Sequence, residues 1–186
     1  MKYGLILMIG LVTAGLAQGQ LLLLGTQELG IEGTIDFDTP GKTALDMNVS
    51  YGYFLFDYIE IKGDFSLYDD DFATAVGLLV SGEYNIDLGI ELVPFVGGGI
   101  GLGRLKYQVY QVTVDEEGEG EVGRIRNKEK NSVLLGVSGG LKYFLAENLA
   151  LSVALNGRVA SEKIFPGKDK MSRTDLSLDW GLRFFF

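Results

Sequence analysis

Residues 176–186 read "LSLDWGLRFFF", and large apolar residues occupy every second position of this segment. The apolar row consists of Leu176, Leu178, Trp180, Leu182, Phe184 and Phe186. The opposite row consists of Asp175, Ser177, Asp179 and Arg183. A period of two residues is typical of a β-strand that has one apolar and one polar face. Because chain ends are ordinarily polar, an aromatic end predicts an apolar solvent or a partner that binds it.

The same alternation recurs in seven segments upstream, and no window after residue 20 shows a convincing helical period. These segments are residues 28–37, 44–57, 58–69, 72–86, 90–109, 132–145 and 149–162. Segment 90–109 is the least regular, and we expect a β-bulge near Gly103, where its phase slips. Short connections (57–58, 87–88, 146–148) alternate with longer or acidic ones (39–42, 68–71, 111–130, 166–172). This pattern predicts an all-β, eight-stranded antiparallel up-and-down transmembrane barrel, with both chain ends on the short-turn side.

The composition excludes several kinds of chemistry. The 186 residues include no Cys and no His, so disulfides, thiolate chemistry, His-ligated zinc sites and Ser-His-Asp triads are all excluded. The formal net charge of −9 argues against a nucleic-acid partner, which requires clustered Lys and Arg. The 27 glycines and only 3 prolines suit glycine-tolerant β-structure.

The first residues have the pattern of a secretory signal. Lys2 is followed by an apolar stretch at 5–12 and by Ala17-Gln18-Gly19, a small-x-small cleavage site. A retained helical anchor is the alternative, because four leucines follow at 21–24. The apolar stretch before Gln18 is too short to span a bilayer comfortably. We therefore expect residues 1–19 to be cleaved and residues 20–186 to form one exported barrel domain.

Alternation alone does not decide which face points inward. The polar rows contain mostly Gly, Ala and Ser among isolated charges, and an eight-stranded barrel leaves room only for small or paired side chains. The apolar rows are therefore expected to face lipid, while a soluble barrel or sandwich is the alternative. Aromatic residues are expected at both interfaces of the bilayer. They are Tyr51, Tyr53, Phe56, Tyr58, Tyr84, Tyr143 and Phe184 at the short-turn end, and Phe37, Phe72 and Tyr107 at the other.

Three segments carry a family resemblance: "ELVPFVGGGIGLGRL", "VLLGVSGGLKYFLAENLALSVAL" and the terminal "DLSLDWGLRFFF". With them the sequence resembles the small bacterial outer-membrane barrels, such as the OmpA-type transmembrane domain and OmpX, from about residue 20 to the end. The resemblance implies the outer membrane of a diderm bacterium, with its lipid and lipopolysaccharide as partners. It also implies that the outer-membrane assembly machinery reads the last strand. Trp180, Phe184 and Phe186 are the expected assembly signal.

If the apolar rows face lipid, the polar rows face inward, and the sequence then predicts a charged lumen. Its expected members are Glu32, Asp36, Asp46, Glu60, Lys62, Asp64, Glu83, Lys142, Arg158, Asp175, Asp179 and Arg183, together with Glu91. Buried charges must pair, because an isolated buried ion costs several kcal/mol. A salt-bridged polar plug is the favoured interpretation, since an eight-stranded interior is mostly filled. A narrow cation-preferring pore is the alternative, because acids outnumber bases.

Two further motifs have ordinary explanations. Residues 111–130 hold five acids between Asp115 and Glu121, followed by four bases. They could bind a divalent cation, a surface partner or lipopolysaccharide phosphates, but a solvated hairpin with attracting arms is favoured. The glycine run at 97–103 fits neither dinucleotide nor phosphate-loop spacing, and we expect it to relieve crowding between strands.

The predicted function is thus that of an integral outer-membrane barrel with a structural or surface-interaction role. A small-solute pore and an adhesin acting through its loops are the alternatives. Outer-membrane barrel enzymes of known families use a catalytic His, so we expect no enzyme, and the sequence indicates no cofactor, metal or oligomeric state.

Overall fold

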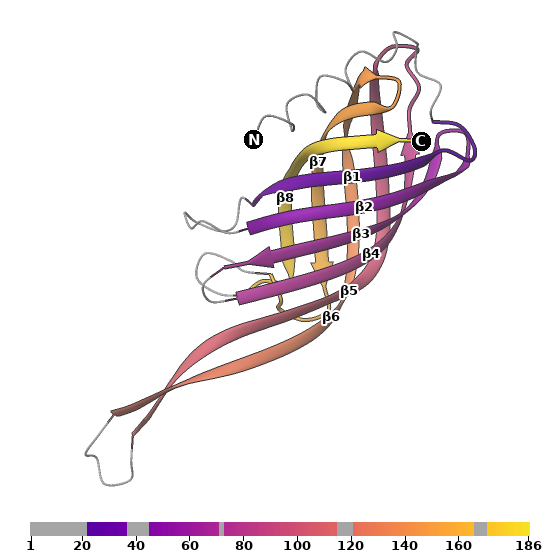
Figure 1. Ribbon diagram of the computed structural model, residues 1–186. Coiled ribbons are helices and arrows are strands. Elements are labelled where there is room, and N and C mark those ends of the chain that lie inside the picture. The colour runs from indigo at the N-terminus through magenta and orange to yellow at the C-terminus, as the bar shows by residue number, and fades with distance from the viewer. Residues whose placement is uncertain (1–21, 37–44, 71–72, 115–120, 166–170) are drawn as a thin grey trace, which may run out of the picture.

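The computed structural model describes residues 22–36, 45–70, 73–114, 121–165 and 171–186. Their eight strands are β1 (Gln27–Asp36), β2 (Leu45–Phe56), β3 (Ile59–Asp69), β4 (Ala73–Asn85), β5 (Leu92–Val114), β6 (Glu121–Ala146), β7 (Leu149–Ala160) and β8 (Thr174–Phe185). Each strand pairs antiparallel with the next, and β8 pairs with β1, so the sheet closes into a barrel (Figure 1). The predicted fold class is confirmed. The expected signal segment lies outside the described residues, as do Phe37 and Phe72.

Among the residues described, no helix is long and apolar enough to cross a membrane.

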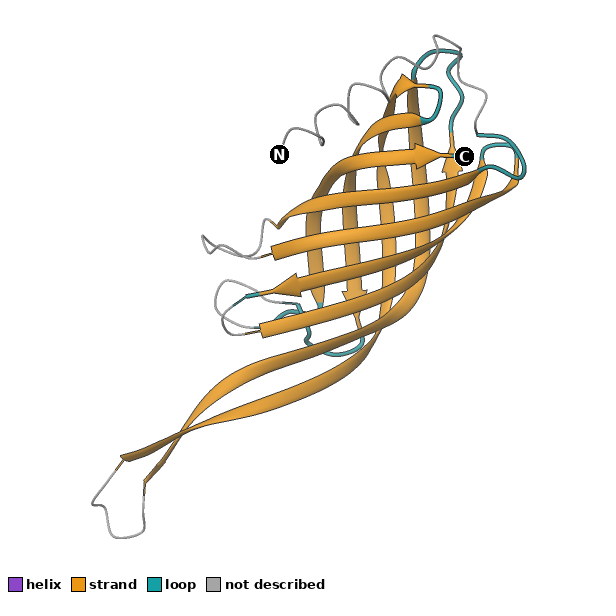
Figure 2. Cartoon of the chain, in the orientation of Figure 1, coloured by secondary structure: helices purple, strands orange, loops and turns teal. Residues whose placement is uncertain are grey.

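The two ends of the barrel differ in their connections (Figure 2). Residues 57–58, 86–91 and 147–148 form the turns at one end, and the C-terminus of β8 lies at this same end. We call it the turn end, and the opposite end the loop end. Tyr58 has a left-handed backbone (φ 66°) at the last position of its turn. Next to this turn, the pairing of β2 with β3 contains a bulge between Phe54 and Phe56. This is the geometry of a short hairpin that closes with a bulge.

Tyr58 also forms hydrogen bonds with neighbouring segments of the turn end. Its N–H donates to the Leu22 carbonyl (2.7 Å), and its carbonyl accepts from the Asn85 N–H (2.8 Å). Its hydroxyl donates to the Asp87 carboxylate at 2.8 Å. Tyr58 thus lies at the turn end, as predicted, and it packs against the apolar cluster there.

Apolar side chains cover the outer wall. The row of β8 that begins at Leu176 and includes Trp180 and Phe186 is exposed or half-buried, whereas Ser177, Asp179 and Arg183 between them are buried. In the other strands, too, the outward row of the barrel wall is mostly apolar. The wall therefore has the arrangement of a barrel whose solvent is apolar, since a soluble barrel would bury these rows.

The segment expected to be a long loop is instead a β-ribbon. β5 continues to Val114 and β6 begins at Glu121, and the two strands stay paired from end to end. The ladder of β5 with β4 ends at Tyr107, and that of β6 with β7 ends at Leu134. Beyond these points the two strands pair only with each other, so a two-stranded ribbon projects from the loop end (Figure 1). The sequence favoured a hairpin here but did not predict that its arms are paired strands, because a charged, glycine-rich segment has weak strand propensity.

The predicted bulge near Gly103 is wrong. The registers of β5 with β4 and with β6 run without a shift, and among the described strands the register shifts lie at 54–56 and 144–146. The apparent slip has another cause. The outward apolar row of β5 ends at Leu102 and the inward row becomes apolar at Leu105, so the hydrophobic residues change rows while the strand keeps its phase.

Candidate functional site

Lys142 is at the centre of the most buried charge cluster of the lumen. It comes from β6, and its ammonium lies 2.6 Å from Glu28 Oε2, 2.6 Å from Glu83 Oε1 and 3.6 Å from Glu60 Oε2. These four side chains are all buried from solvent. The ammonium also faces the rings of Phe54, Phe95 and Phe185 at 6.0, 5.3 and 5.7 Å. Lys142 therefore joins charges from β1, β3 and β4 across the width of the barrel.

Arg183 of β8 extends this cluster toward β1. Its guanidinium binds Glu28 through Nη1 and Glu32 through Nη2, the latter at 2.7 Å. Ser152 donates to the same Glu32 oxygen at 2.8 Å. Glu28 thus bridges Lys142 and Arg183. Alternation alone did not identify Glu28 as a lumen residue, although it occupies the same row as Glu32, four residues earlier.

Lys62 forms the opposite wing of the cluster, on β3. It donates to Glu83 Oε2 at 2.9 Å and lies 3.7 Å from Asp64. Asp64 in turn accepts a hydrogen bond from Ser81 at 2.8 Å. Each buried base of this region has at least two carboxylate partners, which is the condition under which buried charges are tolerated.

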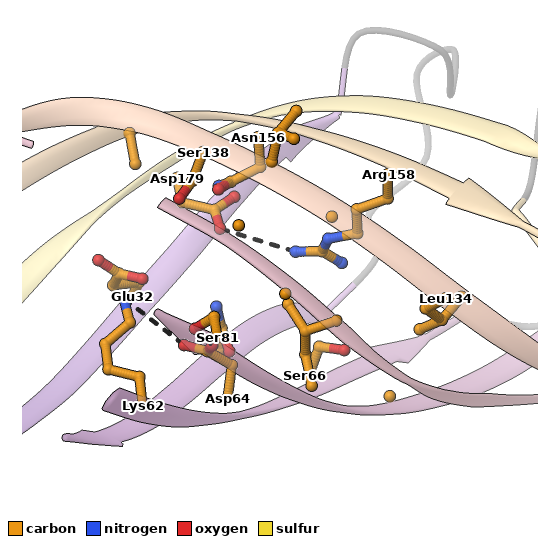
Figure 3. A pocket seen from close by; sticks show the side chains of 18 of the residues that line it. Glu32, Lys62, Asp64, Ser66, Ser81, Leu134, Ser138, Asn156, Arg158 and Asp179 are labelled. Atoms are coloured by element: carbon orange, nitrogen blue, oxygen red, sulfur yellow. Dashed lines mark hydrogen bonds and ion pairs between the residues drawn. The ribbon is translucent and has the colours of Figure 1, made fainter. Parts of the chain in front are cut away.

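A small cavity lies beside this network, toward the loop end (Figure 3). It has a volume of about 60 Å³, and its lining includes Lys62, Asp64, Ser138, Arg158 and Asp179. Arg158 and Asp179 point toward each other across it, at 3.8 Å. The cavity lies against the small residues of β4–β7, where inward-facing glycine and serine leave space. A second cavity of about 60 Å³ follows, lined in part by Asp46, Arg158 and Asp175.

Buried apolar clusters lie inside the barrel at both ends. At the turn end, Leu22, Phe54, Val93, Phe144, Ala150 and Phe185 are buried together. The Phe144 and Phe185 rings pack at 5.0 Å. At the loop end, Ala73, Leu105, Leu134, Ala160 and Ile164 form a second cluster, against which Tyr107 packs. Tyr107 therefore faces inward, not toward lipid as predicted. Apart from Leu22 and Ile164, which lie outside the strands, the buried residues of both clusters occupy inward positions, so strand phase was the signal that could have found them.

The other residues predicted in the lumen are placed as follows. Asp46 and Asp175 line the second cavity. The side chain of Asp36 lies outside the described part of the structure. Glu91 is exposed in the turn between β4 and β5, because the inward phase of β5 begins only after it. At the end of β8, Trp180 and Phe186 are exposed, and Phe184 is half-buried on the same outer row.

The carboxylates around Lys142 have the composition of a metal site. One oxygen each from Glu28, Glu60 and Glu83 lies within 4.8 Å of the others. The Lys142 ammonium already binds all three groups. The carboxylates therefore already surround a cation, and the arrangement resembles an internal crosslink more than a vacant cation site.

Comparison with known proteins agrees with this architecture. No protein-family model and no curated protein sequence matches the chain. Solved structures do match. The N-terminal β-barrel domain of OprF from Pseudomonas aeruginosa is 21% identical with a TM-score of 0.56, over 88% of this chain and 98% of that one. Neisserial surface protein A is 16% identical with a TM-score of 0.59, over 87% and 96%.

Ail, the attachment invasion locus protein of Yersinia pestis, is 11% identical with a TM-score of 0.51, over 88% of this chain and 100% of that one. The fold is thus that of the small eight-stranded outer-membrane β-barrels, as the sequence resemblance predicted. This chain has buried apolar clusters inside both ends of the barrel and a β5–β6 ribbon that extends beyond the pairing of β5 with β4.

Proposed function

We propose that the chain is an integral outer-membrane protein whose barrel is closed, and which has a structural or surface-interaction role. The carrying observation is that the outward rows of the barrel wall are mostly apolar and exposed, whereas the charged side chains of the lumen are buried. Closure of the sheet satisfies the strand hydrogen bonds, which is a requirement within lipid. The proposal includes no catalytic step.

The interior supports a plug in preference to a pore. The Lys142 cluster lies across the lumen, and buried aromatic and aliphatic side chains lie beyond it at each end. The cavities between these layers are about 60 Å³ each, enough for only a few water molecules. An ion would have to cross two apolar layers and displace a paired cluster.

Two measurements test this function. The purified chain is expected to require detergent and to migrate differently on gels before and after heating, because a closed barrel resists unfolding until boiled. A chain that is soluble without detergent would defeat the membrane assignment. In planar bilayers, the inserted barrel is expected to give no discrete conductance steps. Reproducible single-channel steps would favour the cation-preferring pore.

The β5–β6 ribbon favours a second role, attachment through the surface. Its two strands continue beyond the last pairing of β5 with β4, at Tyr107, and so extend away from the barrel. A shortened variant tests this role: residues 109–126 are removed, and Gln108 is joined to Asn127 by an Asn-Gly turn. These two residues are paired in the ladder, so a two-residue hairpin suits their geometry.

Attachment of bacteria that display the full or shortened chain to cultured animal cells is the readout. Removal of residues 166–170, in the connection between β7 and β8, is the control deletion. Weaker attachment with only the ribbon deletion would support the second role, and unchanged attachment would remove it.

A further inference from the structure

Two buried side chains of the first cavity have oxygens without a hydrogen-bond partner. Asp179 of β8 is 1% exposed and Asn48 of β2 is 7% exposed, and both line this cavity. Among the described residues, no group donates a hydrogen bond to either oxygen of the Asp179 carboxylate or to Asn48 Oδ1. Arg158 approaches Asp179 only to 3.8 Å, so it offsets part of the charge without forming a hydrogen bond. Because buried acceptors without partners cost free energy, these three oxygens favour a ligand in the cavity.

The charge around the two cavities favours a cation as this ligand. Their linings together contain five acids and three bases: Glu32, Asp46, Asp64, Asp175 and Asp179 against Lys62, Arg158 and Arg183. Two of the bases are also shared with acids outside the linings, because Lys62 binds Glu83 and Arg183 binds Glu28. The neighbouring Lys142 cluster has three acids around one base, so it supplies no positive charge to spare. The linings therefore have an excess of negative charge, which a bound cation would reduce.

The ligand atoms and the space indicate which cation fits. Carboxylate and carboxamide oxygens are ligands of hard cations. A divalent cation usually gathers several carboxylates directly on the ion. Among the described residues, the only three acids whose oxygens meet closely enough are Glu28, Glu60 and Glu83, which already surround Lys142. A volume of about 60 Å³ has room for a small ion and a few waters.

We propose that the first cavity binds one small monovalent cation, of the Na⁺ or K⁺ class, together with water. Asp179 and the Asn48 carboxamide are its protein ligands. Ser66 and Ser138, which also line the cavity (Figure 3), are suited to hold its waters. The inference rests on the plugged barrel proposed above and deepens it, because an ion held between the two apolar clusters is a resident of the plug and does not pass through it.

The test measures urea unfolding of the full chain, folded in neutral detergent at pH 8. NaCl or KCl replaces choline chloride at constant ionic strength, because choline is too large for the cavity and acts only by screening. A ligand of the folded state raises the folding equilibrium constant in proportion to its concentration, once this exceeds the Kd. For the preferred ion we therefore expect the constant to rise about tenfold for each tenfold increase in concentration within that range.

Three variants locate the ion by their dependence on the cation, whatever their stability in choline chloride. Asp179→Asn keeps the shape of the side chain but removes its charge, and it is expected to abolish most of the dependence. Asn48→Leu removes the other ligand at similar size, and it is expected to weaken the dependence. Glu91→Gln removes an exposed acid in the turn between β4 and β5, and it is expected to keep the full dependence.

Crystals soaked in a thallium(I) salt give the position directly. Thallium(I) is a heavy monovalent cation, and we expect its anomalous signal between Asp179 and Asn48. A signal at the Lys142 cluster alone, or none in the lumen, would contradict the site.

Other outcomes also overturn the proposal. Equal stability in NaCl, KCl and choline chloride would mean that water or protons alone compensate the acceptors. Full dependence in Asp179→Asn would place the ion elsewhere, and stronger stabilisation by CaCl₂ would indicate a divalent site. Heat-modifiable migration and planar-bilayer recordings are made in parallel. Conductance steps or a lack of heat-modifiability would defeat the proposed function, whereas a heat-modifiable, silent barrel without cation dependence defeats the ion site alone.

Discussion

At the residue scale, Lys142 shows how a narrow barrel accommodates a buried cation. Its ammonium is fully buried and binds three carboxylates from three other strands. Glu28 and Glu83 have a second base as well, Arg183 and Lys62 respectively. The ion pair of Glu60 with Lys142 is its only one among the described residues. Loss of the lysine would therefore leave Glu60 with the least compensation.

Replacing this lysine tests the plug. Lys142→Met keeps most of the apolar stem but removes the charge, and we expect a loss of about 3–5 kcal/mol because buried acids are left uncompensated. Urea unfolding of the detergent-folded barrel measures it. The double variant Lys142→Met/Glu60→Gln is expected to recover part of the loss. If Lys142→Met were no more costly than Lys128→Met, an exposed control, the cluster would not stabilise the barrel.

Gly52 makes room for one of these acids. A methyl group at this inward position of β2 would overlap the Glu60 carboxylate and approach the Lys62 stem at 2.9 Å. Gly52→Ala is expected to cost about 1–3 kcal/mol, as overpacking does. Gly63→Ala is the matched control, because nothing lies within 4 Å of the added methyl group. Equal unfolding midpoints for both variants would contradict this account.

The turn end contains a pH-dependent contact between two turns. The Gly89 N–H and then the Tyr58 hydroxyl donate to Asp87, and they lower the pKa of its carboxyl group. A lowered folded-state pKa stabilises the fold above the unfolded-state pKa, and this stabilisation is lost as the pH falls through the folded value. Tyr58→Phe is expected to raise the pKa of Asp87 partway toward normal, as measured by carboxyl-carbon NMR titration. An unchanged pKa would mean that the hydroxyl does not bind Asp87 in solution.

At the element scale, β8 explains the three terminal phenylalanines. Phe184 and Phe186 lie on the outer row, whereas Phe185 is buried inside and packs on Phe144. Gln27 pairs with Phe186 through two backbone hydrogen bonds, of 2.9 and 3.0 Å, so the aromatic end closes the barrel against β1. The three terminal phenylalanines thus contribute both to the outer wall and to the apolar cluster inside the turn end.

This division predicts different defects for neighbouring residues. Phe185→Ala is expected to destabilise the refolded barrel by about 3–5 kcal/mol, because a large buried ring is removed. Phe186→Ala is expected to leave the refolded stability nearly unchanged while reducing the amount assembled in cells, if the assembly machinery reads the outer row. Stability is measured in urea, and assembly by heat-modifiable migration of membrane fractions. A large loss of refolded stability in Phe186→Ala and none in Phe185→Ala would contradict the placement of Phe186 outside and Phe185 inside.

The strands also show what the sequence could and could not predict. Alternation predicted eight strands and the outward rows because each side chain follows the phase of its strand. It failed in segment 90–109, where Gly97, Gly99, Gly101 and Gly103 face inward and give no hydrophobic signal. The expectation that these glycines relieve crowding is confirmed at Gly99 and Gly101, where a methyl group would overlap backbone carbonyls of β4.

At the scale of the whole molecule, the lumen is layered. An apolar cluster at the turn end is followed by the Lys142 network, two small cavities and a second apolar cluster. Charge pairs such as Arg158 with Asp179 depend on strand register and on rotamers, which alternation does not fix. The sequence could therefore indicate which charges face inward but not which of them meet.

The measurement that tests the central claim most directly is the environment of each face of one strand. The chain contains no Cys, so single spin labels can be attached at Leu151, Ser152, Val153, Ala154 and Leu155 of β7 after mutation to Cys. Each variant is reconstituted in lipid bilayers after a check of its heat-modifiable migration. Labels at 151, 153 and 155 are expected to collide readily with dissolved oxygen, which concentrates in lipid, and those at 152 and 154 to be shielded. Oxygen collisions that are high at 152 and 154 and low at 151, 153 and 155 would place the apolar row inside and contradict the account.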